Sequence, residues 1–133
     1  MACIPLLLTA PWIIISDINS RRIPNLSLLV LWVLIEISDF GDSWRTQLAL
    51  HELAVSLLVG GILINLVTRE SIGMGDVKLI SLIGLMIGRT NLVLEGLTYS
   101  AILGLFWVAI ARKRSIPFAP SLIIGALLVA VGL

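Results

Sequence analysis

The chain has 133 residues, of which 59% are hydrophobic and only 13% are charged, and its net charge is +1. Soluble domains have ~45–50% apolar and ~25% charged residues, so this chain cannot bury its apolar side chains in one water-facing core and needs lipid as its solvent. The small net charge argues against a nucleic-acid partner, and the single cysteine, Cys3, excludes an internal disulfide and a cysteine zinc site.

Polar residues divide the chain into six apolar segments, which we expect to be membrane helices: residues 2–16, 26–40, 48–68, 77–89, 92–111 and 117–133. A bilayer span needs ~20 residues, a length that the third and fifth segments reach and the others do not, so we expect local thinning or protein-lined ends there. The first segment lacks the basic region of a signal peptide, so we expect it to be retained. No repeat or linker is visible, which favours a single domain over residues 1–133.

The basic residues predict the orientation of these segments. With loop 17–25 in the cytoplasm, seven of the nine Lys and Arg residues lie on that side, and only Arg45 and Arg89 lie on the other. This positive-inside bias favours an all-α bundle of six transmembrane helices with both termini on the non-cytoplasmic side. On this topology no acid lies at mid-membrane, which argues against a pump or transporter with a proton relay.

The first polar motif is Asp17-Ile-Asn-Ser-Arg-Arg-Ile-Pro-Asn25, in which Asp17 is expected to close the first helix. Pro24 biases Ile23 away from the helical region, so the chain turns before the second helix. One interpretation is an ordinary polar turn in which Arg21 and Arg22 anchor the topology at the headgroups.

The second polar motif is Gly73-Met-Gly-Asp-Val-Lys-Leu79. Asp76 precedes an apolar helix and is expected at its N-cap, where a carboxylate satisfies free N–H groups. On a structural interpretation, Lys78 is an interfacial anchor and the glycines form a flexible turn. On a functional one, Gly73 and Gly75 let a peptide backbone pass close to the carboxylate of Asp76.

Together the two motifs resemble those of the type IV prepilin leader peptidases, membrane-embedded aspartic proteases of the Gly-x-Gly-Asp type. The resemblance covers nearly the whole chain, and it extends to Arg69-Glu70 before the glycines and to Ile116-Pro-Phe-Ala-Pro120 with Gly125. Larger members of the family carry an N-terminal cytoplasmic domain with paired cysteines that methylates the cleaved pilin. This chain shows no such pattern, so the resemblance implies a peptidase-only form.

The resemblance implies that Asp17 and Asp76 are the catalytic pair, with no cofactor and no metal. In such a pair one carboxylate takes a proton from water while the other, protonated, polarises the carbonyl. Because 59 residues separate the two acids, helices one and four are expected to pack together. Gly73 and Gly75 would shape the approach to Asp76. Lys78 would steady the loop or face lipid, and Glu70 would attract the substrate or be an ordinary loop charge.

The implied substrate is a prepilin or pseudopilin with a short basic leader and an apolar helix, cleaved at the cytoplasmic face of a bacterial inner membrane. Two alternatives stay open, namely a non-catalytic membrane scaffold or carrier subunit and a protease of this type with a different single-span substrate. His51 and Glu52, near the outer end of the third segment, offer too few ligands for a metal, so we expect interfacial polar residues.

Overall fold

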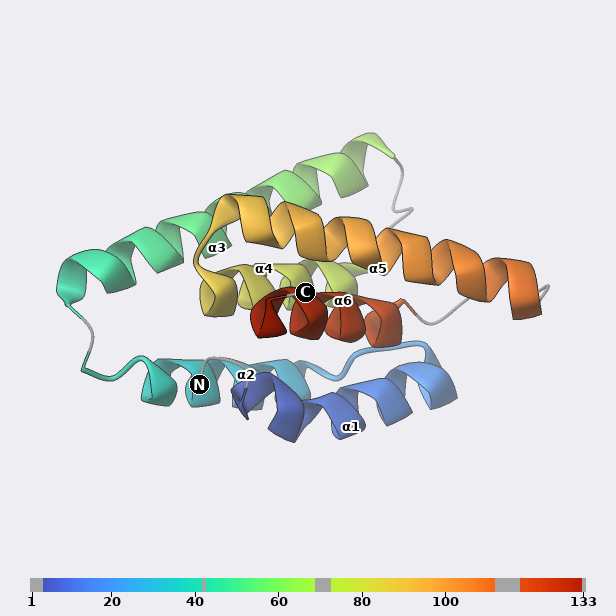
Figure 1. The fold of residues 1–133 in the computed structure, drawn as a ribbon, viewed down its shortest axis with the longest axis horizontal. Coiled ribbons are helices and arrows are strands. Elements are labelled where there is room, and N and C mark those ends of the chain that lie inside the picture. Colours follow the sequence, from blue (N-terminus) through green and yellow to red (C-terminus); the bar gives the residue numbers. More distant parts are fainter. Residues whose placement is uncertain (1–3, 42, 69–72, 112–117, 133) are drawn as a thin grey trace.

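The computed structural model describes residues 4–41, 43–68, 73–111 and 118–132 (Figure 1). These ranges form six helices and no strand: α1 (Ile4–Ser20), α2 (Asn25–Ser38), α3 (Trp44–Val67), α4 (Met74–Ile87), α5 (Thr90–Ala111) and α6 (Ala119–Val131). The all-α prediction is therefore confirmed, with one helix on each predicted segment. Two helices, α3 and α5, are long and apolar enough to cross a membrane, and α1, α2 and α6 are shorter apolar helices. The number of spans and the orientation of the termini stay predictions.

Successive helices run in opposite directions. The last residues of α1, α3 and α5 and the first residues of α2, α4 and α6 therefore lie toward one end of the molecule, on the right in Figure 1. Asp17, in the last turn of α1, and Asp76, in the first turn of α4, both belong to this end. The prediction that the two acids lie at the same end is thus confirmed, and the assignment of that end to the cytoplasm stays a prediction.

The helices pack as three antiparallel hairpins, α1–α2, α3–α4 and α5–α6. The two helices of a hairpin contact each other more extensively than helices of different hairpins do. Contacts of α2 with α4, of α4 with α6 and of α6 with α1 close these four helices into a ring, which we call the four-helix ring. The helices α3 and α5 flank the ring, on α4 and α6 respectively. In this arrangement α1 and α4 occupy opposite corners and do not pack along each other, so the predicted direct packing of helices one and four is wrong.

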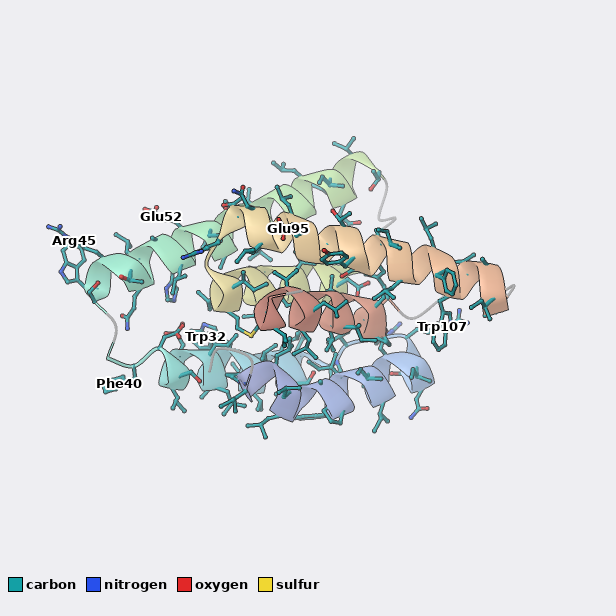
Figure 2. The ribbon with its side chains drawn as sticks, in the orientation of Figure 1. Trp32, Phe40, Arg45, Glu52, Glu95 and Trp107 are labelled. Atoms are coloured by element: carbon teal, nitrogen blue, oxygen red, sulfur yellow. The ribbon has the colours of Figure 1, made fainter. Side chains whose placement is uncertain are left out.

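The apolar core lies inside the four-helix ring. Each ring helix contributes fully buried side chains, such as Ile13 of α1, Leu31 of α2, Leu79 of α4 and Leu122 of α6. In contrast, large apolar side chains of the flanking helices and of the outer ring surface point outward, among them Trp107 of α5 and Trp32 of α2 (Figure 2). Such an inside-and-outside apolar distribution is that of a protein whose surroundings are lipid.

Small residues let α5 and α6 approach closely. A Cβ atom added at Gly125 would lie 2.5 Å from the carbonyl oxygen of Gly96, and the Ser100 side chain closes the same gap. Because main-chain atoms form this contact, a larger residue could be accommodated only by moving a helix. The close packing fixes α6, whose first residue is part of the site described below.

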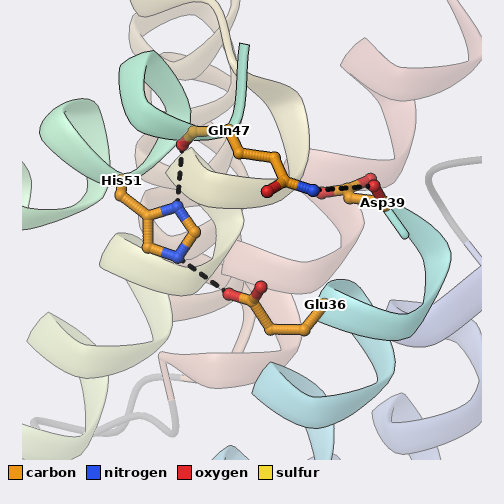
Figure 3. A network of polar contacts seen from close by, with 4 residues as sticks. All are labelled: Glu36, Asp39, Gln47 and His51. Atoms are coloured by element: carbon orange, nitrogen blue, oxygen red, sulfur yellow. Dashed lines mark hydrogen bonds and ion pairs between the residues drawn. The ribbon is translucent and has the colours of Figure 1, made fainter. Parts of the chain in front are cut away.

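At the other end of the molecule a polar network joins α2 to α3 (Figure 3). His51 contacts the Gln47 carbonyl oxygen through Nδ1 at 2.8 Å and Glu36 Oε1 through Nε2 at 2.9 Å, and Gln47 Nε2 donates to the Asp39 carbonyl oxygen at 3.2 Å. A carbonyl oxygen only accepts, so Nδ1 carries a hydrogen, and the bond to Glu36 requires a further proton on the ring or on the carboxyl. Within the described ranges, no group of three or more potential metal ligands is formed.

Candidate active site

Asp17 is held in the interior of the ring by a main-chain donor. Its side chain is 5% exposed, and its Oδ2 atom accepts a hydrogen bond of 3.0 Å from the backbone N–H of Ala119, the first residue of α6. The helix continues for one more turn to Ser20, so the prediction that Asp17 closes the first helix is wrong by three residues. Arg21, with φ of 51°, ends the helix instead.

Asp76 lies inside the first turn of α4 and not at its N-cap, so that part of the prediction is wrong. Gly73 is the N-cap, with an extended backbone at φ −62° and ψ 135°, and Met74 begins the helix. Glycine is among the residues favoured at an N-cap, so Gly73 can take that position and the helix begins two residues before the acid. The carboxyl of Asp76 is consequently directed back over the start of its own helix, where a Cβ atom on Gly73 would lie 3.2 Å from Asp76 Oδ2.

The two carboxyls interact electrostatically across the ring. Asp17 follows the apolar run that ends at Ser16, and Asp76 precedes the run that begins at Val77, so both lie just outside the predicted membrane-spanning segments. Burial, and then the negative charge of Asp17, raise the pKa of Asp76 from 3.8 to about 6. Burial also raises the pKa of Asp17, and the N–H of Ala119 acts in the opposite direction. Raised pKa values on both acids are what a pair that holds one proton between them requires.

The two sequence motifs also contact each other directly. A Cβ atom on Gly75 would lie 3.0 Å from Ile23 Cβ, so the start of α4 packs against the turn that follows Asp17. Lys78 Nζ donates a hydrogen bond of 3.1 Å to Asn25 Oδ1, at the start of α2. Lys78 thus has a protein partner in the first motif, beyond the interfacial role that its position suggests.

The remaining predicted residues have different outcomes. Arg22 lies exposed in the turn after α1, as expected of a residue at the membrane boundary. Glu70 and Arg69 lie outside the described residues, as do Ile116 and Pro117. The roles predicted for all of these side chains stay predictions.

Sequence reasoning missed the contribution of α6 to the site. The signal was present, because Pro120 in the first turn is typical of a helix start, and a helix start provides free N–H groups. Nothing in the local pattern indicated that Ala119 faces Asp17, which is 102 residues away in the sequence.

Comparison with known proteins identifies the family. The profile of the Type IV leader peptidase family matches residues 2–131, nearly the whole chain, so both aspartate motifs and Ala119 fall within the match. A search of curated proteins found no match, and a search of solved structures found none either. Because this match covers nearly the whole sequence, the chain belongs to the type IV leader peptidase family, a family of proteases.

Proposed function

We propose that this protein is an aspartic endopeptidase that removes the short basic leader from prepilin-like membrane proteins, with Asp17 and Asp76 as its catalytic pair. The observation that carries the proposal is that the four-helix ring holds two acids at one end, Asp17 buried and Asp76 partly buried, and that the charge of Asp17 raises the pKa of Asp76. Membership of a protease family adds the reaction class. A pair of this kind needs neither a nucleophilic side chain nor a metal, because water is the nucleophile.

The reaction follows from the shared proton. The ionised carboxylate takes a proton from a water molecule, whose oxygen attacks the carbonyl carbon of the scissile amide, while the protonated carboxyl gives its proton to the carbonyl oxygen. The tetrahedral intermediate then collapses as its C–N bond breaks: the carboxyl that gained a proton from water transfers it to the leaving nitrogen, and one hydroxyl of the intermediate returns its proton to the other carboxylate as the C=O bond re-forms. The two products are a carboxylic acid and an amine, and the pair returns to its starting state.

The position of the pair favours a substrate cut at the membrane boundary. Both acids lie at one end of the ring, where α1 ends and α4 begins, and the basic residues favour a cytoplasmic location for that end. We therefore place the enzyme in the bacterial inner membrane, as one domain with six spans and both termini outside. An apolar substrate helix would lie in the bilayer beside the enzyme, and its basic leader would reach the pair at the cytoplasmic face.

The test is cleavage of a co-expressed single-span protein with a basic leader, read as a shift in its electrophoretic mobility. Asp17→Asn and Asp76→Asn should each abolish cleavage while the protein still accumulates in the membrane. Glu95→Gln is the matched control, because it makes the same carboxylate-to-amide change at an exposed position of α5, and it should cleave normally. Inhibitors of serine and cysteine proteases and metal chelators should have no effect.

Each alternative predicts a different result. If either aspartate variant still shortens the substrate, the pair is not catalytic, and a scaffold or carrier role gains support. The wild-type protein could instead leave prepilin-like substrates intact and cleave another single-span protein in an aspartate-dependent manner. That result would support the aspartic mechanism and reject the proposed substrate class.

A further inference from the structure

We propose that the backbone N–H of Ala119 is a positioning group that keeps Asp17 as the ionised member of the pair, so that Asp17 activates the water and Asp76 carries the proton. The inference rests on the proposed function and assigns a role to each acid. It starts from the 3.0 Å hydrogen bond between Ala119 N and Asp17 Oδ2, which brings the start of α6 into the site.

The start of α6 is well suited to hold a negative charge. The N–H groups of the first helical turn have no partner within the helix, and their dipoles favour an anion. Pro120 has no N–H, and Phe118 at the N-cap provides no side-chain cap, so Ala119 is a main donor of this turn. An N–H group donates to either form of a carboxyl, but its bond to a carboxylate is stronger. This preference stabilises the ionised form of Asp17 over the protonated form.

Among the residues that the structure describes, the hydrogen bond to the Asp17 carboxyl comes from the main chain of α6. Because α6 contains no charged residue, it stabilises the charge of Asp17 through its main chain. Arg21 and Arg22 lie in the exposed turn after α1, and Lys78 is exposed on α4, where it donates to Asn25. Asp17 itself is 5% exposed and turned toward α6.

The two acids differ in what accompanies their burial. Burial raises the pKa of both, but the N–H of Ala119 acts against it at Asp17, whereas at Asp76 the charge of Asp17 adds to it and the pKa rises to about 6. Because two neighbouring acids cannot both ionise easily, stabilising the charge on Asp17 leaves the proton on Asp76. In the reaction Asp17 then accepts the proton of water, and Asp76 donates its proton to the carbonyl oxygen.

A single-atom change tests this assignment. Replacing Ala119 by lactic acid, through nonsense suppression during cell-free synthesis into nanodiscs, exchanges the N–H for an ester oxygen and keeps the methyl group. The matched control is the leucine α-hydroxy acid at Leu122, which removes an N–H of the same helix that donates to the Phe118 carbonyl oxygen at 3.0 Å. Cleavage of a synthetic single-span peptide with a basic leader is measured as a function of pH for all three proteins.

The expected result is a shift of the acidic limb of the pH profile. Without its donor, Asp17 should ionise about one pH unit higher, which lowers the rate about tenfold at a pH below that limb. The ester at Leu122 should leave the limb in place. An ester at Ala119 whose acidic limb matches that of wild type would overturn the inference, whereas a wild-type protein that does not cleave would overturn the proposed function.

A second measurement needs no altered backbone and covers the case in which the ester protein fails to fold. Aspartate labelled with ¹³C at the carboxyl is placed at Asp17 or at Asp76 of the otherwise wild-type protein, and infrared spectra are recorded near pH 5. We expect the carbonyl band of a protonated acid from Asp76 and a carboxylate band from Asp17. The reverse pattern would overturn the assignment.

Discussion

Substituting alanine for Gly75 separates the effect of site geometry from that of stability. Gly75 lies in the first turn of α4, and a Cβ atom there would be 3.0 Å from Ile23 Cβ and 3.4 Å from its Cγ1. Carbon atoms pack at ~3.5–4.0 Å, so the turn that carries Ile23 must move away by roughly 0.5–1 Å. That turn follows the last helical turn of α1, which carries Asp17, and the movement should therefore change the spacing of the two acids.

The magnitudes favour a loss of activity over a loss of stability. Overpacking costs about 1–3 kcal/mol, but alanine is favoured over glycine in a helix by about 1 kcal/mol, so the free energy of unfolding should fall by only ~0–2 kcal/mol. A displacement of about 1 Å at a reacting centre can lower the rate by about 10²-fold. We therefore expect Gly75→Ala to accumulate normally and to cleave about 10- to 100-fold more slowly.

The assay is single-turnover cleavage of a leader peptide by purified protein in nanodiscs, combined with thermal unfolding of the same samples. Gly60→Ala is the matched control, because Gly60 lies within α3 and its added Cβ would meet no atom within 4 Å. The control should unfold at the same or a higher temperature and should cleave at the wild-type rate. Wild-type cleavage by Gly75→Ala, or equal losses in both variants, would refute the reasoning.

Three further predictions concern other parts of the site and its support. Since the pKa of Asp76 is about 6, against an ordinary 3.8, its proton is retained up to about pH 6 and lost above it. Cleavage should therefore decline as pH rises through that value. Asp17→Asn removes the negative charge near Asp76, so it should lower the pKa of Asp76 in an infrared titration, and an unchanged pKa would contradict the electrostatic effect of Asp17 on Asp76. Gly125→Ala should lower the free energy of unfolding by about 3 kcal/mol, because main-chain atoms of α5 obstruct the added methyl group, and an unchanged unfolding temperature would contradict this. Lys78→Met removes an exposed hydrogen bond to Asn25, so we expect a loss below about 1 kcal/mol in denaturant unfolding, and a larger loss would show that the bond is less solvated than its exposure indicates.

The sequence predicts the elements of this fold well because the information is local. Apolar runs separated by charged residues indicate each helix, and an even alternation of direction then places Asp17 and Asp76 at one end of the molecule. Helix starts are less well predicted. Asp76 resembles an N-cap residue, but Gly73 takes that position, because glycine is also favoured there and the local sequence does not decide between the two.

The contacts that build the site could not be predicted, because they join residues far apart in the chain. The hydrogen bond from Ala119 to Asp17 depends on how α6 packs against α1. The hydrogen bond from Lys78 to Asn25 depends on how α4 packs against α2. No periodicity in the sequence encodes which corner of a helix ring an element occupies. The resemblance to a peptidase family indicated which acids matter, but not that α1 and α4 lie diagonally and that α6 contributes a donor.

The three hairpins have a consequence for the biogenesis of the enzyme. One hairpin carries Asp17, the second carries Asp76 and the third carries the N–H of Ala119, so no hairpin holds a complete site. The ribosome synthesises the hairpins in that order, so the start of α6 is made last. On the proposed function, the complete site should therefore form only when the final pair of helices has docked, and the nascent chain should hydrolyse little before that point.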